Sequence, residues 1–224
     1  MTSSLAIDPS VVVRSVPEPA RAKELLTRPL LVLMHGRGSH EHDLFALASM
    51  LSPQFVVAAL RAPLELGPGS YSWFPDGEPA QPSSMAADAA VQALFDWLDS
   101  VPSAVSVSLL GFSQGGAMTL HALRHAPERF AALVNLAGFL IGGDAPADHL
   151  LETLRPLVFW GRDPADPVIP AKAIARTAEW LLSHSTLIER RYVGIGHSIS
   201  REELADVNTH LDSAVSAAPS ESHV

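Results

Sequence analysis

The stretch VSVSLLGFSQGGAM, residues 105–118, decides the fold. Its first six residues form an apolar run that predicts a buried strand, and residues 114–125 have the apolar spacing of a helix. Between the two lies the pentapeptide from Gly111 to Gly115, a G-x-S-x-G sequence in the strand–turn–helix setting that an activated serine requires. A Cβ at either glycine would meet the neighbouring backbone. We therefore predict that Ser113 is a nucleophile on a strained turn.

The helix predicted after Ser113 points its N-terminus at the same place. The Gln114 N–H and the helix dipole would therefore face a developing oxyanion. The alternative interpretation is a glycine-rich turn with a bystander serine. The preceding strand, the following helix and the additional Gly116 argue against that alternative.

Outside this stretch, short apolar runs alternate with amphipathic segments along most of the chain. Strands are predicted at 29–35, 55–60, 105–110, 132–138, 156–161 and 187–193, and helices at 85–98, 114–125, 171–182 and 201–214. This alternation predicts an α/β fold with a mostly parallel central sheet and helices on both faces. Ser200 and Glu203 predict a capping box for the last helix. Residues 64–84 form the longest irregular stretch, which suggests a functional segment.

Length and composition narrow the class of protein. We expect one domain over residues 1–216 and a disordered tail over 217–224, with no insertion large enough for a cap domain. A net charge of −9 without clustered Lys and Arg disfavours nucleic acid as a partner. The chain has no cysteine, which excludes disulfides, zinc–thiolate sites and a Cys nucleophile. No secretory signal and no long apolar run is visible, so we expect a soluble cytoplasmic protein without a membrane span.

Several separate motifs give the chain a family resemblance. It resembles the phospholipase/carboxylesterase family of α/β-hydrolases, which includes acyl-protein thioesterases and small bacterial carboxylesterases. The similar segments are LMHGRGSHEHDL (33–44), RAPLELGPGSYSWF (61–74), GFSQGGAM (111–118), DPVIP (166–170) and GHSIS (196–200). The resemblance extends from about residue 30 to residue 211 and implies an α/β-hydrolase fold with a serine nucleophile, an acid and a histidine in that order.

The partners of Ser113 are sought downstream of it, because a serine needs a positioned base at neutral pH. His197 lies in a glycine-rich turn between the last predicted strand and the last helix, and is the predicted base. For the acid, the Asp-Pro-x-x-Pro pattern of the family falls on Asp166. Asp163 has a shorter spacing from Gly161 and stays as the alternative acid.

The resemblance also implies roles for four further residues. The backbone N–H of Arg37, in the loop after an early strand, would be the second oxyanion donor besides Gln114, or alternatively the side chain of Arg37 is what this position requires. Trp73 and Phe74 would border the acyl pocket, or alternatively plug the loop to the core. Arg61 is interpreted as a structural anchor for that loop, with a substrate contact as the alternative.

No metal or cofactor is predicted. His121 and His125 have the i, i+4 spacing of a helical metal pair, but no Glu lies between them as in H-E-x-x-H and no third ligand is apparent. The acidic residues beside His40 and His42 are interpreted as complements of a helix dipole.

The expected function is hydrolysis of a small acyl ester. The first hypothesis is a serine carboxylesterase that cleaves short-chain esters through an acyl-enzyme intermediate. An acyl thioesterase or lysophospholipase with the same triad is the alternative. A catalytically silent α/β-hydrolase scaffold that acts as a binding protein is a remote alternative. A homodimer is compatible with a small hydrolase that lacks a cap.

Overall fold

The computed structural model describes residues 5–75, 80 and 82–217. Two short 3₁₀ turns, Ala48–Met50 and Pro127–Arg129, accompany the helices and strands. The elements follow along the chain as β1 (Val13–Arg14), α1 (Glu18–Leu25), β2 (Leu30–Met34), α2 (Glu41–Phe45), β3 (Val56–Leu60), β4 (Leu64–Gly67), β5 (Ser70–Ser72), α3 (Ser84–Ser100), β6 (Val107–Phe112), α4 (Gln114–Leu123), β7 (Ala132–Leu136), α5 (Asp148–Leu154), β8 (Leu157–Arg162), α6 (Ala171–His184), β9 (Thr186–Arg191) and α7 (Arg201–Ala217).

The central sheet has seven strands in the order β1-β3-β2-β6-β7-β8-β9. All neighbouring strands run parallel except β1, which pairs antiparallel with β3 at one edge. All five residues of β2, β3 and β7 are buried, which explains why these strands appear in the sequence as continuous apolar runs. The prediction of a mostly parallel central sheet is confirmed.

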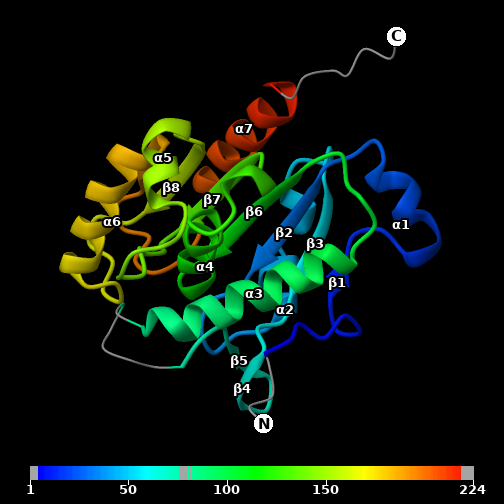
Figure 1. Ribbon diagram of the computed structural model, residues 1–224, viewed down its shortest axis with the longest axis horizontal. Coiled ribbons are helices and arrows are strands. Elements are labelled where there is room, and N and C mark those ends of the chain that lie inside the picture. Colours follow the sequence, from blue (N-terminus) through cyan, green and yellow to red (C-terminus); the bar gives the residue numbers. More distant parts are fainter. Residues whose placement is uncertain (1–4, 76–79, 81, 218–224) are drawn as a thin grey trace.

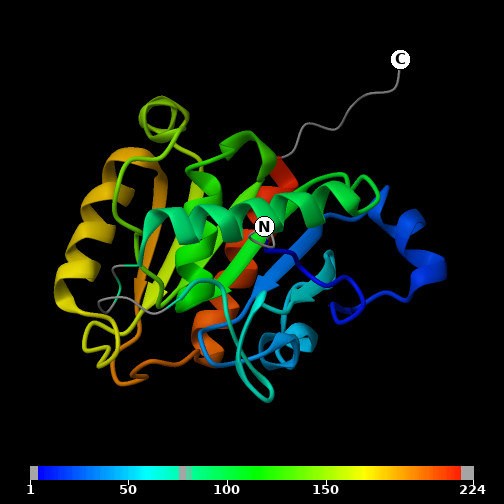
Figure 2. The same ribbon diagram turned by 60° about the horizontal axis from the view of Figure 1, so that its bottom comes forward.

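Helices cover both faces of this sheet, as predicted. Helices α3 and α4 lie in front of the sheet in Figure 1 and α7 lies behind it. Figure 2 shows α1 and α6 at opposite ends of the molecule. The two faces form two hydrophobic clusters, and alternate residues of β2 contribute to each. Val32 packs with the side of α3 and α4, and Leu33 packs with the side of α2 and α7.

The structure contains elements that the sequence analysis did not predict. These are β1, α1, α2, α5 and the antiparallel hairpin of β4 and β5 within the stretch interpreted as irregular. All except α1 have seven residues or fewer, which is too short for a clear periodicity. Helix α7 extends through Ala217, and residues 218–224 of the expected tail lie outside the described residues. Within the described part of the chain, no helix is long and apolar enough to cross a membrane.

The last helix begins as the capping box predicts. Glu203 N–H donates to Ser200 Oγ at 3.0 Å, and Ser200 N–H donates to Glu203 Oε2 at 3.4 Å. This pair fixes the loop between β9 and α7, which carries His197.

The carboxyl ends of the parallel strands all point to one edge of the sheet. Six loops leave this edge, and those after β2, β3, β6, β8 and β9 carry His35, Arg61, Ser113, Asp163 and His197 respectively. In open α/β sheets this edge is where ligands bind, so the site is sought there.

Candidate active site

Ser113 occupies the sharp turn between β6 and α4. Its φ of 56° and ψ of −115° lie in a region that residues with a side chain rarely adopt. Its N–H donates to Leu136 O at 2.8 Å, and its own carbonyl accepts from Ala117 N–H at 3.0 Å. The turn is therefore held from the neighbouring strand β7 and from the first turn of α4.

Glycines on both sides of Ser113 make this turn sterically feasible. A Cβ on Gly111 would overlap the backbone of Gly115, and a Cβ on Gly115 would overlap the carbonyl of Met34. Helix α4 therefore approaches β2 and β6 more closely than any side chain would allow. This close approach was predicted from the sequence and is observed.

The imidazole of His197 lies between Ser113 and Asp166. Its Nε2 is 2.9 Å from Ser113 Oγ and its Nδ1 is 2.7 Å from Asp166 Oδ2. The ring of Phe112 packs against the imidazole with centroids 4.9 Å apart. The side chain of Asp166 is 1% exposed and that of His197 is 16% exposed. The Asp166 carboxylate is thus sealed from water, while the His197 imidazole retains access to solvent.

The two aspartates after β8 have different partners. Asp166 Oδ1 accepts from the N–H groups of Val168 and Ile169 at 2.7 and 3.1 Å, which leaves Oδ2 for His197. Asp163 Oδ2 instead accepts from the N–H groups of Gly194 and Gly196 at 2.8 and 2.7 Å.

The backbone N–H of Ala165, followed by those of Gly196, Gly194 and Ile195, holds the pKa of Asp163 below its usual value. Asp163 therefore fastens the loop that carries His197, whereas Asp166 contacts the imidazole itself.

The loop after β2, which contains Arg37, approaches Ser113 through Gly36. A Cβ on Gly36 would lie 3.4 Å from the Cβ of Ser113 and 3.2 Å from the Phe112 ring, so only glycine fits comfortably. Gly38 N–H donates to Tyr71 O at 2.8 Å and Tyr71 N–H donates to Ser39 O at 2.9 Å. The β4–β5 hairpin thereby holds the far side of this loop.

His35 is a buried residue beside the Ser113 turn that was predicted from the sequence only as part of a motif. It is buried, its Nδ1 is 2.7 Å from Gly36 O, and its Nε2 is 3.1 Å from Ala62 N. The hydrogen-bond network assigns the proton to Nδ1, since Ala62 N–H can only donate. Burial lowers the pKa of His35, the Gly36 carbonyl opposing this effect, so the imidazole is neutral. His35 thus links the loops after β2 and β3.

The side chain of Gln114 has a role that the sequence analysis missed. Its Oε1 accepts from Trp73 N–H at 2.8 Å and its Nε2 donates to Phe74 O at 3.0 Å. Because Gln114 opens α4, its own backbone N–H has no acceptor within the helix. The residue therefore offers a backbone donor beside Ser113 while its side chain fastens the segment after β5.

Trp73 and Phe74 are buried at 0% and 3% exposure in the cluster on the α3 and α4 side of the sheet. Trp73 Nε1 donates to His35 O at 2.8 Å, which ties this segment to the loop that carries Arg37. Their role as walls of an acyl pocket stays a prediction.

Arg61 anchors the same loops, as the sequence analysis interpreted it. Its Nε and Nη2 donate to Glu41 Oε2 and Oε1 at 2.6 and 2.5 Å, and its guanidinium lies 4.6 Å from the Tyr71 ring centroid. The paired guanidinium lowers the pKa of Glu41, whose side chain is 2% exposed. Helix α2 is thereby joined to the end of β3.

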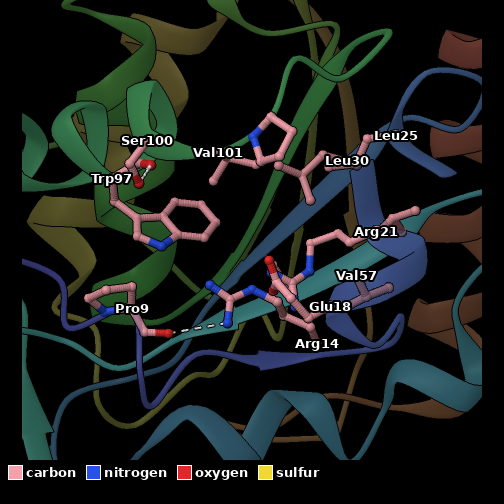
Figure 3. Close-up of a pocket in the computed structure, with 13 residues that line it drawn as sticks. Pro9, Arg14, Glu18, Arg21, Leu25, Leu30, Val57, Trp97, Ser100 and Val101 are labelled. Carbon is pink, nitrogen blue, oxygen red and sulfur yellow. Dashed lines mark hydrogen bonds and ion pairs between the residues drawn. The ribbon is translucent and has the colours of Figure 1, made fainter. Parts of the chain in front are cut away.

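A cavity of about 340 Å³ lies elsewhere, between β1, α1 and the end of α3 (Figure 3). Its lining includes Arg14, Leu30 and Trp97, and Arg14 donates to Pro9 O at 3.2 Å. Leu30 is the first residue of β2, so this cavity lies at the amino ends of the strands. It is therefore separate from the edge that carries Ser113.

The strained serine turn on a mostly parallel, helix-covered sheet defines the chain as an α/β-hydrolase. The chain belongs to the phospholipase/carboxylesterase family, whose model matches residues 20–215. It is therefore a hydrolase of a family with carboxylesterase and thioesterase members.

Three relatives illustrate the similarity. The protein named "Probable carboxylesterase" of Oryza sativa subsp. japonica is 26% identical over 225 residues, which cover 91% of this chain and 84% of that protein. Acyl-protein thioesterase 1 of Kluyveromyces lactis is 28% identical over 123 residues, about half of each chain at 53% and 54%. The crystal structure of esterase PE8 superposes with a TM-score of 0.71 at 24% identity, covering 95% of this chain and all of that one.

Proposed function

We propose that this protein is a serine carboxylesterase that cleaves short-chain acyl esters through an acyl-enzyme intermediate on Ser113. The observation that carries the proposal is the continuous chain of hydrogen bonds from Asp166 through His197 to Ser113 Oγ. It ends on a serine in a strained conformation at the start of a helix, which is the arrangement of an activated nucleophile.

Each of the three residues has a distinct step in the proposed reaction. Ser113 Oγ attacks the acyl carbonyl while His197 Nε2 takes its proton. Asp166 holds the imidazole with Nδ1–H toward its carboxylate and stabilises the charged ring. His197 then protonates the leaving alcohol, and water repeats the sequence on the acyl-enzyme. No cofactor enters this scheme.

The N–H groups of Gln114 and Arg37 are the proposed oxyanion donors. Gln114 supplies the first N–H of α4, where the helix dipole favours negative charge. Arg37 follows Gly36, which packs against the nucleophile turn. The links from His35 to Ala62 and from Gly38 to Tyr71 support this loop, and such preorganisation is what makes an oxyanion site effective.

Short acyl chains are favoured because the site is open. The His197 side chain is 16% exposed, and the loops between strands in the described ranges contain no inserted domain over it. The thioesterase named among the relatives favours thioester hydrolysis as the second candidate, with the same residues in the same roles. Trp73 and Phe74 remain the proposed border of the acyl pocket.

Labelling with a fluorophosphonate probe tests the nucleophile. We expect one label per wild-type chain, none in Ser113→Ala, and unchanged labelling in Ser103→Ala, an exposed serine in the loop before β6. The Ser113→Ala variant should also lose activity by several orders of magnitude while keeping its fold. Retained labelling or activity in that variant would reject Ser113, and an unlabelled, well-folded wild type would favour the silent scaffold.

Substrate class is tested separately on the active enzyme. Nitrophenyl butyrate, nitrophenyl palmitate and a butyryl thioester are compared by kcat/KM. A preference for the short oxygen ester supports the proposal. A preference for the thioester or for the long chain would reverse the order of the two candidates.

A further inference from the structure

Three side chains of types that can bind a metal ion lie together between α3 and α4, away from the candidate active site. Asp88, His121 and His125 each offer one ligand atom, and these atoms lie within 4.8 Å of one another. Among the residues that the structure describes, no other three His, Asp or Glu side chains bring their ligand atoms together in this way. The sequence analysis noted the histidine pair but found no third ligand, because Asp88 is 33 residues from His121 in the chain.

The contacts within the group converge on one carboxylate oxygen. His121 Nε2 is 2.7 Å and His125 Nε2 is 3.1 Å from the same Asp88 Oδ1. The two imidazoles meet edge to face with centroids 4.8 Å apart. Both ring nitrogens therefore point to the same carboxylate oxygen, and the three ligand atoms form one compact group.

Burial and charge at this point suit a cation. The side chain of His121 is 2% exposed, that of His125 is 20% exposed and that of Asp88 is 47% exposed, so the group is fixed on one side and open to solvent on the other. The Asp88 carboxylate supplies negative charge to the group, and imidazole nitrogens are common ligands of transition-metal ions.

The neighbouring positive charge of Arg124 is paired with other groups. Arg124 lies between the two histidines in the sequence, but its guanidinium donates to Asp148 at 2.7 Å and to Ile141 O at 2.7 Å. The last carbonyls of α4, which ends at Leu123, add partial negative charge beside the histidines.

We propose that Asp88, His121 and His125 form a binding site for a divalent transition-metal ion such as Zn²⁺, which joins α3 to the C-terminal end of α4. Imidazole and carboxylate together suit this class of ion, and water would complete the coordination from the open side. Ligands of a tetrahedral Zn²⁺ lie about 3.3 Å apart. The two separations from Asp88 Oδ1 are 2.7 and 3.1 Å, and all three ligand atoms lie within 4.8 Å of one another, so rotations of these side chains would bring them to that value.

Metal binding would move one proton on each histidine. Each Nε2 must be freed of hydrogen before it can bind the ion, and a neutral imidazole can carry its proton on Nδ1 instead. His121 Nδ1 has no partner in the described part of the chain, so this tautomer breaks no existing contact there. The ion then replaces the two hydrogen bonds to Asp88.

The proposed site is structural with respect to ester hydrolysis. His121 lies eight residues after Ser113 along the chain, which corresponds to about 12 Å along α4. The ion would therefore stabilise the helix whose first residue is Gln114 without touching the reacting atoms.

Zn²⁺ binding to the full chain, purified without a histidine tag, tests the proposal. Equilibrium dialysis at roughly 100 µM Zn²⁺ should give one bound ion per wild-type chain. His125→Gln and Asp88→Asn should each lose it, since both side chains are partly exposed and their replacement should leave the fold intact. The matched controls are His149→Gln, whose side chain is 99% exposed, and Asp96→Asn on the same helix α3.

A second measurement separates binding from general damage. A hundredfold excess of Zn²⁺ over its dissociation constant should raise the unfolding midpoint of the wild type by roughly 5–10 °C, and not that of the two ligand variants. Hydrolysis of nitrophenyl butyrate should stay unchanged in His125→Gln. The absence of bound Zn²⁺ in the wild type, or binding that survives both ligand variants, would overturn the site.

Discussion

Glu203 is a buried carboxyl group whose ionisation should control stability near neutral pH. The residue is 1% exposed, and its Oε1 lies against Gly161, where a Cβ would overlap it. Burial raises the pKa of Glu203 to about 7, with the Ser200 N–H opposing this effect and Asp206 adding to it. The change that we consider is Glu203→Gln, which keeps the shape and an acceptor for the Ser200 N–H but cannot ionise.

The direction in which pH changes the stability follows from the number of protons bound by the folded and the unfolded chain. The unfolded chain loses the proton near the ordinary value of 4.5, and the folded chain loses it only near 7. The folded state therefore holds more protons between these values, and wild-type stability falls as pH rises through this window. A pKa shift of this size corresponds to a change of about 3 kcal/mol in the free energy of unfolding over the whole titration. Of this, about 2.5 kcal/mol should develop between pH 5 and pH 8.

The measurement is denaturant unfolding of the wild type and of Glu203→Gln at pH 5 and at pH 8. The free energy of unfolding of the variant, relative to that of the wild type, should rise by about 2.5 kcal/mol from pH 5 to pH 8. For a chain of this size this corresponds to about 5–10 °C in the unfolding midpoint. Other titrating groups cancel in the difference. Glu202→Gln, an exposed neighbour on α7, should show no such gain.

Two results would contradict the prediction that Glu203 has a raised pKa in the fold. If the difference in unfolding free energy between wild type and Glu203→Gln is the same at pH 5 and pH 8, Glu203 titrates at an ordinary pKa in the fold. A variant that is less stable than wild type at pH 8 would mean that the ionised carboxylate is held by favourable contacts.

Three further predictions concern the site and its supports. Asp166→Asn should lower kcat by about 10⁴-fold, because Oδ2 orients His197. Asp163→Asn should lower kcat far less and mainly loosen the loop at Gly194 and Gly196; equal losses in kcat/KM would contradict this division. Arg61→Ala should lower the free energy of unfolding, measured by chemical denaturation, by about 2 kcal/mol, because the buried Glu41 carboxylate loses its bidentate guanidinium partner and is left with the 3.4 Å contact to His42 Nε2. Arg21→Ala on α1 serves as the comparison, and an equal loss there would argue against this explanation. Gly115→Ala should lower the thermal midpoint by several degrees, because the added Cβ overlaps the Met34 carbonyl; a circular-dichroism melt like that of wild type would show that α4 can shift.

The parts of the fold predicted from sequence are those that depend on neighbouring residues. The turn at Ser113 needs glycine at Gly111 and Gly115, and both lie within two residues of it. The strands buried on both faces appear as continuous apolar runs, and the capping box of Ser200 and Glu203 spans one helical turn. Short elements such as α2 and the β4–β5 hairpin were missed because five residues or fewer carry no clear period.

The sequence by itself determined the serine turn, the mostly parallel sheet and the order of the residues that follow Ser113. Only the tertiary structure decided which of Asp163 and Asp166 contacts His197, since both lie on one loop and differ only in the direction of their carboxylates. It also decided that the Gln114 side chain holds the segment of Trp73 and that Glu203 is buried. The physical reason is the separation along the chain, because preferences for backbone dihedral angles and hydrophobic periodicity depend only on residues a few positions apart. Contacts between residues far apart in the chain exist only once the sheet has brought its loops and helices together.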